Sequence, residues 1–240
     1  MNLAIDIGNT RRKTGLFNET GLLETQVITD WSLDYLISYC NQAGVRNIIV
    51  SSVAAPDETL NKALAQYFDI LELSHETPLP FENQYATPRT LGKDRLAAVA
   101  GAQALLPRQH SLVVDCGTCI KYDLLTQTGE YLGGNIAPGA IMRTKAMQHF
   151  TARLPEVDLQ IPASIIGNST ETALQNGAFM GAALEIGGFV ALFQKMLQPL
   201  NVILTGGDAA FFQPLLNVTN LTIEPHLTLY GLNNILIFNN

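Results

Sequence analysis

The sequence is poor in cysteine and in basic residues, and each shortage excludes a class of protein. Its 240 residues include only three cysteines, an odd number that does not suit a secreted domain held together by disulfides. Lysine and arginine total 14 against 21 acidic residues, so the formal net charge is −7. Because nucleic-acid binding normally needs a clustered basic face, we expect no nucleic-acid partner.

Long uninterrupted apolar runs are also missing. No such run approaches the roughly 20 residues that cross a bilayer, and the N-terminal MNLAIDIGNT lacks the basic segment of a signal peptide. We therefore expect no membrane association and a cytoplasmic protein. The hydrophobic content of 47% is spread over short segments, which predicts a globular protein with a sizeable core.

The first half of the chain alternates between predicted strands and helices. Three strand-like segments, LAIDI, KTGLF and LLETQVIT, are separated by turn residues and predict an antiparallel meander. Helical spacing follows over residues 31–43 and 57–67, with the buried strands RNIIVSSV and FDILEL between and after them. This alternation predicts an α/β layer structure.

The second half repeats the opening of the first. Aligning Asp6 with Asp115 places Gly8 on Gly117, each at the end of an apolar strand that a second strand follows. The strands of this half are expected in SLVVDCGT, CIKYDLL and EYLGGNIA. Helical patterns lie near 138–150 and 171–197.

A duplicated hairpin predicts two similar α/β domains with a ligand cleft between them. The boundary is expected in LLPRQH, where Pro107 and polar residues interrupt the apolar pattern. We therefore expect an N-terminal domain over residues 1–108 and a C-terminal domain over residues 109–240. Two domains joined so tightly are expected to close on a ligand in the cleft, as hinged kinases do.

The turn DIGNTRRK, residues 6–13, has the composition of a phosphate-binding loop. A glycine lets backbone N–H groups approach a phosphate, and Lys13 adds a positive charge. Asp6, at the strand end, suits a hydrated Mg²⁺ or another divalent cation that bridges phosphate oxygens. An ordinary hairpin with a polar turn is the alternative.

The second copy of this turn, DCGT at 115–118, favours the phosphate interpretation. A clamp around a phosphate chain needs two such turns, one from each side. If Asp115 faces Asp6, the two carboxylates repel each other unless cations lie between them. The pair therefore predicts bound cations as well as a nucleotide.

Two glycine-rich turns follow, GGNIAPG at 133–139 and TGGDA at 205–209. Each is expected to end a strand and open a helix. Such turns let an adenine or a ribose lie against the backbone, and a helix N-terminus favours phosphate. The alternative for both turns is a simple helix start.

The segment LGKDR, residues 91–95, opens an apolar helix and allows two interpretations. Asp94 either caps the helix and complements its dipole or accepts the proton of a substrate hydroxyl. In the second case Arg95 binds an anionic group of the substrate.

Cys116 and Cys119 form a C-x-x-C pair. The pair suggests a redox site or half of a zinc site, but no second pair accompanies it. We therefore favour two thiols that simply pack beside a turn.

Taken in order, four motifs resemble those of the type III pantothenate kinases, within the acetate and sugar kinase, Hsp70 and actin superfamily. DIGNTRRK resembles the first phosphate motif, LGKDR the substrate motif, DCGT the second phosphate motif and GGNIAPG the adenosine-side motif. The resemblance covers nearly the whole chain. It implies two actin-like (ribonuclease H-like) domains, each a mixed sheet flanked by helices, and ATP-dependent phosphorylation of pantothenate, the first step of coenzyme A synthesis.

The resemblance also implies roles for particular residues. Asp94 is the general base, and Asp115 binds the monovalent cation, K⁺ or NH₄⁺, that the family requires besides Mg²⁺. Contacts with ATP are implied for Asp6, Ile7, Gly8, Asn9, Thr10, Arg11, Arg12, Lys13 and Thr118. Contacts with pantothenate are implied for Tyr85, Gly92, Lys93, Asp94, Arg95 and Thr170.

The sequence departs from the family pattern at two places. NSTETALQNG has an inserted Ser169, so Ser169 or Thr172 could replace Thr170, whose alternative role is an N-cap. The usual D-x-G-T-A-x-T becomes DCGTCIK, with Cys119 for Ala and Lys121 for the later Thr. Lys121 either reaches a phosphate or faces solvent, and we expect the solvent-facing position.

The resemblance points to a homodimer with the apolar stretch 172–197 as its interface, although a helix buried inside its own domain fits the same pattern. Two alternatives to a pantothenate kinase remain open. One is another small-molecule kinase of the same superfamily. The other is a non-catalytic nucleotide-binding regulator.

Overall fold

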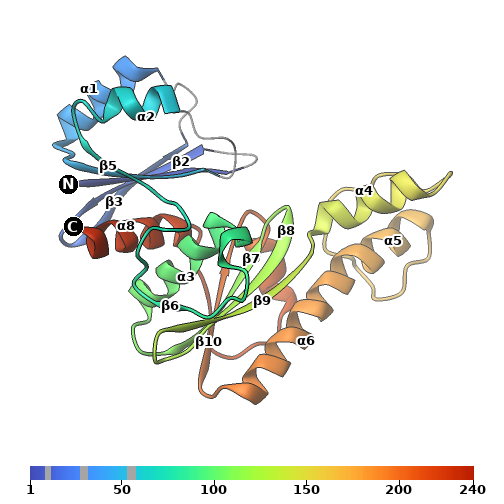
Figure 1. Ribbon diagram of the computed structural model, residues 1–240. Helices are drawn as coiled ribbons and strands as arrows, with labels where there is room; N and C mark the ends of the chain where they lie inside the picture. Colours follow the sequence, from blue (N-terminus) through green and yellow to red (C-terminus); the bar gives the residue numbers. More distant parts are fainter. Residues whose placement is uncertain (9–11, 28–31, 53–57) are drawn as a thin grey trace. The chain divides into compact units, whose positions relative to one another are not determined.

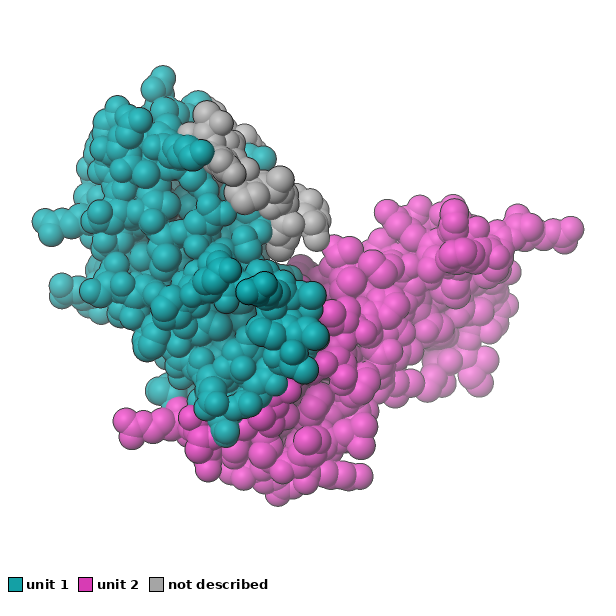
Figure 2. All heavy atoms as spheres, viewed as in Figure 1, with its two compact units in different colours: residues 1–107, 129–131, 226–240 teal, residues 108–128, 132–225 magenta. Residues whose placement is uncertain are grey.

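The chain folds into two compact units in a computed structural model that describes residues 1–8, 12–27, 32–52 and 58–240 (Figure 1). Unit 1 contains residues 1–107, 129–131 and 226–240, and unit 2 contains residues 108–128 and 132–225 (Figure 2).

The division into units differs from the expected one at the C-terminus. The first break follows Pro107, next to the expected boundary after residue 108. Residues 226–240, however, pack in unit 1, whereas the sequence placed all of 109–240 in one domain. That the two units are separate, similar domains stays a prediction. Its boundaries differ from those expected, because residues 226–240 belong to unit 1.

Unit 1 contains a five-stranded mixed sheet whose strands are β1 (Asn2–Ile7), β2 (Arg12–Asn18), β3 (Gly21–Val27), β4 (Asn47–Ser52) and β5 (Asp69–Glu72). Their order across the sheet is β3-β2-β1-β4-β5. β2 pairs antiparallel with both β1 and β3, so the predicted meander is confirmed. β4 lies parallel to β1, and β5 lies parallel to β4.

Helices cover both faces of this sheet. On one face, Leu3 and Ile5 of β1 pack with Leu36 of α1 (Leu33–Ala43) and Leu64 of α2 (Glu58–Leu64). α1 ends at Gly44, whose φ of 66° is the left-handed conformation that a glycine adopts without strain. The opposite face carries α8 (Leu227–Asn239), which contacts β1, β2 and β4 and packs along α3 (Lys93–Leu105).

α3 and α8 approach each other through two glycines. A Cβ atom on Gly231 would lie 1.7 Å from the carbonyl oxygen of Ala97, and one on Gly101 would lie 2.2 Å from that of Leu227. No other residue type fits at so short a backbone separation. The contact fixes the start of α8 beside the sheet.

A short segment completes unit 1. β6 (Glu82–Asn83) pairs in parallel with the first residues of β9 (Glu130–Pro138), with Asn83 opposite Tyr131. The 3₁₀ turn η1 (Pro88–Thr90) then leads into α3.

Unit 2 repeats the sheet of unit 1. Its strands are β7 (His110–Cys116), β8 (Cys119–Leu125), β9, β10 (Leu200–Thr205) and β11 (Leu221–Ile223), in the order β11-β10-β7-β8-β9. β8 runs antiparallel to β7, while β10 is parallel to both β7 and β11. Read from its other edge, this order is β9-β8-β7-β10-β11, which corresponds position by position to β3-β2-β1-β4-β5 in unit 1. This correspondence bears out the repeat predicted from the sequence.

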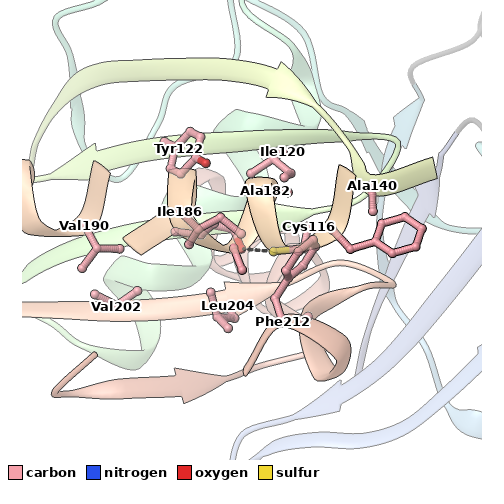
Figure 3. Close-up of a cluster of buried hydrophobic side chains, with 14 of the residues drawn as sticks. Cys116, Ile120, Tyr122, Ala140, Ala182, Ile186, Val190, Val202, Leu204 and Phe212 are labelled. Carbon is pink, nitrogen blue, oxygen red and sulfur yellow. Dashed lines mark hydrogen bonds between the residues drawn. The ribbon is translucent and has the colours of Figure 1, made fainter. Parts of the chain in front are cut away.

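Helices pack on the sheet of unit 2 and form a continuous apolar core with it. Figure 3 shows Val190 and Ile186 of α6 facing Val202 and Leu204 of β10, with Tyr122 of β8 beside them. The helical elements of this unit are α4 (Ala140–Phe150), α5 (Thr170–Gln175), the π-helical turn η2 (Asn176–Met180), α6 (Gly181–Met196), α7 (Ala209–Phe212) and η3 (Gln213–Leu215).

The continuous helical run Thr170–Met196 stands out by its length and hydropathy. By these two properties alone it is long and apolar enough to cross a membrane, and 33% of its most apolar window is buried. The expectation that no segment meets such a criterion was therefore wrong. A single helix of this kind is weak evidence, since a helix that packs in the core of a protein meets the same criterion.

Candidate functional site

Asp6 occupies the end of β1 in unit 1, where three elements meet. It lies opposite Lys13 in the antiparallel pairing with β2 and beside Ser51 in the parallel pairing with β4. The hydroxyl of Thr228, in the first turn of α8, donates a hydrogen bond to Asp6 Oδ2 at 3.2 Å. This arrangement holds the carboxylate at the strand end from which a phosphate-binding turn would start.

The remaining residues of the first phosphate motif surround this strand end. Ile7 ends β1 opposite Arg12, which begins β2, and Gly8 follows Ile7 directly. Three further residues of the motif, Asn9, Thr10 and Arg11, lie outside the described part of the chain.

The start of α3 carries Asp94 in its first turn. Gly92 is the N-cap, Lys93 begins the helix, and Asp94 Oδ1 accepts a hydrogen bond of 2.9 Å from the backbone N–H of Arg95. The same N–H also donates to the carbonyl oxygen of Gly92 at 3.1 Å, so Asp94 shares this helix-start donor with the backbone. A carboxylate with this bond keeps further lone pairs that can accept a proton or a hydrogen bond.

Arg95 is buried and stacks on an aromatic pair. Only 4% of its surface is exposed, and Cζ of its guanidinium lies 5.4 Å from the ring centroid of Tyr85. The Tyr85 ring is stacked on Tyr131 at 6.2 Å. Unit 1 thus brings Tyr85 and Arg95 together with Asp94, and the cation–π contact orients a guanidinium that can bind an anion.

Three turns of unit 2 meet at the end of β7. The N–H of Gly139, the N-cap of α4, donates to the carbonyl oxygen of Thr118 at 3.1 Å, and the N–H of Asp208 donates to that of Cys116 at 2.9 Å. A Cβ atom on Gly139 would lie 2.3 Å from the carbonyl oxygen of Gly117. The motifs DCGT, GGNIAPG and TGGDA therefore converge at one point, with the exposed Thr118 at the tip of the hairpin.

Two details of these turns differ from expectation. GGNIAPG is part of β9 up to Pro138, and only Gly139 opens the helix. TGGDA does end β10 and open a helix, but α7 has only four residues.

Lys121 does not face solvent, and this expectation was wrong. It lies opposite Asp115 in the β7–β8 pairing, so both side chains project from the same face of the hairpin. Its Nζ is 2.7 Å from Asp115 Oδ2, and each side chain is 17% exposed. The separation is that of a strong charge-assisted hydrogen bond.

The geometry at Asp115 does not fit the monovalent cation that the family resemblance implies. A lysine ammonium already occupies the position next to Oδ2. Within the described ranges, no group of three or more His, Cys, Asp or Glu side chains is arranged to hold a metal ion. Asp6, with one carboxylate at a strand end, fits a Mg²⁺ ion that keeps most of its waters.

Sequence reasoning missed Thr228 and the carboxyl of Asp208. Thr228 lies 222 residues from the aspartate it contacts, and no motif marks it. Asp208 belongs to a turn that the sequence did single out, and burial raises the pKa of its carboxyl.

The two thiols of the C-x-x-C pair are free, and Cys116 is fully buried. Burial, together with the carboxylates of Asp115 and Asp208, raises the pKa of the Cys116 thiol. Its Sγ contacts the carbonyl oxygen of Val114 at 3.9 Å within the core (Figure 3). The favoured interpretation of packed thiols is confirmed for Cys116.

The N-cap of α5 is Ser169 rather than Thr170. Ser169 Oγ accepts a hydrogen bond from the backbone N–H of Thr172, and the Thr172 hydroxyl accepts one from the N–H of Ser169. The N-cap alternative for Thr170 is therefore wrong. Thr170 is an exposed first residue of the helix in unit 2.

Comparison with known sequences identifies one family along the chain. The family model described as "Type III pantothenate kinase" matches residues 2–192. A type III pantothenate kinase of Phocaeicola vulgatus is 42% identical over 240 residues, which cover 100% of this chain and 99% of the relative. That of Christiangramia forsetii is 41% identical over 244 residues, with 100% and 99% covered.

Comparison with solved structures shows the fold. A Campylobacter jejuni protein assigned to the Baf family of transcriptional activators superposes with a TM-score of 0.61 and 24% identity, over 99% of this chain and 98% of that one. A ROK family protein of Streptococcus pneumoniae gives a TM-score of 0.52 and 13% identity, over 99% and 98%. The predicted fold class, α/β with mixed sheets flanked by helices, is confirmed.

Proposed function

Because this chain belongs to the type III pantothenate kinase family, we propose that it phosphorylates pantothenate with ATP and that Asp94 is its general base. The enzyme is a phosphotransferase with an alcohol group as acceptor, and its product, 4'-phosphopantothenate, enters coenzyme A synthesis. The observation that carries the proposal is the similarity at 42% identity over the full length of both chains.

All but one of the substrate-side residues of the proposal lie in unit 1. Pantothenate carries a carboxylate at one end, and the buried Arg95, oriented by the ring of Tyr85, supplies a matching positive charge. Gly92 and Lys93 stand at the helix start beside Asp94. Thr170, in unit 2, is proposed as a further contact because of its place in the family motif.

Phosphoryl transfer requires mainly positioning and charge neutralisation. In the proposed mechanism Asp94 orients the primary hydroxyl of pantothenate for in-line attack and accepts its proton. Lys13, Arg12 and the amides of the first turn offset charge on the γ-phosphate, and Thr118 contacts the nucleotide from unit 2. The other proposed ATP contacts are Ile7, Gly8, Asn9, Thr10 and Arg11. That the first and second hairpins bind the same nucleotide is also a prediction.

Asp6 is the proposed ligand of Mg²⁺ or another divalent ion, through water. Such an ion would supply charge for the phosphate oxygens. The monovalent cation of the family finds no comparable fit at Asp115, because Lys121 already contacts that carboxylate.

The acceptor is tested by measuring ADP release with pantothenate and with a panel of sugars. We expect turnover with pantothenate, and mass spectrometry should identify phosphopantothenate as the product. Turnover with a sugar alone would identify another small-molecule kinase. ATP binding without turnover of any acceptor would favour a non-catalytic regulator; the likeness to the Baf protein, at 24% identity, concerns the fold alone.

We further propose a cytoplasmic homodimer that uses the exposed side of α6. The side chains of Leu184 and Leu192 on this apolar helix are 67% and 57% exposed. Exposed apolar side chains of this size suit a surface that a second copy of the chain covers. Light scattering should give twice the chain mass, and Leu184→Arg should give a monomer. Ile237→Arg, at the 59% exposed Ile237 of α8, is the matched control and should stay dimeric. A native protein of single-chain mass would contradict the dimer.

A further inference from the structure

The ion pair between Lys121 and Asp115 is built into the second hairpin rather than placed on its surface. Antiparallel pairing puts the two residues opposite each other, next to the last residue pair before the turn that joins β7 to β8. Nζ and Oδ2 are 2.7 Å apart, and 17% of each side chain is exposed. Water therefore screens this pair less than a surface pair, so the ammonium holds its position more firmly.

The other oxygen of Asp115 faces the backbone. A Cβ atom added to Gly206 would lie 2.4 Å from Oδ1, and one added to Gly117 would lie 3.4 Å from it. Gly206 has a φ of 88°, so the close approach and the left-handed turn both call for glycine. The carboxylate is thus enclosed, with an ammonium on one oxygen and a glycine turn against the other.

An enclosed, neutralised carboxylate is a poor ligand for a free cation. Hard cations need several oxygen ligands and must give up water to reach them. A K⁺ ion at Asp115 would also lie beside the ammonium and be repelled by it.

We propose that the Lys121 ammonium is a covalently attached substitute for a monovalent cation, so that this kinase works without K⁺ or NH₄⁺. A lysine ammonium carries the same charge as either ion and presents three N–H donors. Its attachment to β8 keeps it next to Asp115 at any salt composition. The inference rests on the proposed kinase function, and it deepens that function at its second phosphate turn.

The first test compares turnover of the wild-type protein with and without K⁺. ADP release with pantothenate is measured in tetramethylammonium chloride and in KCl at equal ionic strength. We expect the two rates to agree within about twofold. Activation by K⁺ or NH₄⁺ of about tenfold or more would overturn the proposal.

The second test removes the attached charge. Lys121→Thr restores the residue type of the family motif, and Lys121→Met keeps an unbranched stem without the charge. Each variant should lose at least about tenfold in rate without K⁺ and regain most of it in KCl. Full activity of both variants without K⁺ would also overturn the proposal, since no cation would then be needed at Asp115.

Lys145→Thr is the matched control. It removes the same charge from the same unit, but Lys145 Nζ lies 3.9 Å from Glu156 and its side chain is 62% exposed. Its rate should not depend on K⁺ any more than that of the wild type.

A binding measurement separates this inference from the function itself. A ligand that binds only the folded state raises the midpoint of thermal unfolding. With ATP present and pantothenate absent, K⁺ should raise the midpoint of Lys121→Thr and leave that of the wild type unchanged. If neither the wild type nor any variant turned over pantothenate in any salt, the proposed function would fail. The thermal measurement would still decide whether Lys121 takes the place of a bound K⁺ ion. If the variants did not fold, the wild-type salt dependence alone would decide it.

Discussion

The hairpins of the two units are built alike, and each aspartate has a side-chain contact that is particular to its unit. Asp6 lies opposite Lys13 in unit 1, and Asp115 lies opposite Lys121 in unit 2, each at the end of a strand with the same neighbours in its sheet. Asp6 accepts a hydrogen bond from Thr228, whereas Asp115 pairs with an ammonium within its own hairpin.

This difference shows that the duplicated backbone fixes where a carboxylate stands but not every side chain that contacts it. The hydroxyl that contacts Asp6 is neutral and adds no charge beside that carboxylate. An ammonium at 2.7 Å offsets the charge of Asp115. Two equivalent positions thereby acquire different roles in the proposed site.

The largest expected effect concerns a role that we assign to unit 1 alone, the general base. Asp94→Asn should lower kcat by about two to four decades, because the amide cannot accept the proton of the attacking hydroxyl. Steady-state measurement of ADP release should show the KM for ATP nearly unchanged.

Asp34→Asn is the control for this variant. Asp34 is an exposed aspartate in the first turn of α1, so the substitution makes the same chemical change at another helix start of unit 1. It should leave kcat unaltered. Normal turnover of Asp94→Asn would remove Asp94 from the base role.

The next effect contrasts the glycines of α8 in unit 1 with those of α6 in unit 2. Gly231→Ala should lower the free energy of unfolding by about 1–3 kcal/mol, since its methyl group would overlap the carbonyl oxygen of Ala97. A methyl group on Gly187 would have no atom of another described segment within 4 Å, so Gly187→Ala should raise stability by up to about 1 kcal/mol through helix propensity. Urea titrations followed by circular dichroism measure both changes. Equal effects would show that α3 and α8 do not approach as described.

The smallest expected effect removes the support that is particular to Asp6. Thr228→Val deletes the hydroxyl that donates to Oδ2 and should raise the KM for ATP by about two- to tenfold, the range of one hydrogen bond. Thr25→Val, at an exposed position of β3, is the control in the same sheet and should not change the KM. An unchanged KM for Thr228→Val would mean that this hydrogen bond to Asp6 does not contribute to ATP binding.

Sequence patterns predicted the sheets well because alternation and turn residues are local signals. The meander of β1 to β3 and the repeat of its topology in unit 2 both followed from apolar segments and from aligning Asp6 with Asp115. The helix α3 with Asp94 in its first turn was also expected.

Contacts between distant segments could not be predicted in this way. The return of α8 to unit 1 depends on the close fit of Gly101 and Gly231, and neither glycine shows in sequence which helix it will meet. The position of Lys121 was misjudged because the side of a hairpin that a residue faces depends on the pairing register.

The sequence by itself therefore determined the strands, the duplicated turns and the family, since each is encoded in residues close together along the chain. Only the tertiary structure decided which groups compensate the two aspartates. The physical reason is that a hydroxyl or an ammonium acts on a carboxylate over about 3 Å, and packing alone brings groups to that distance.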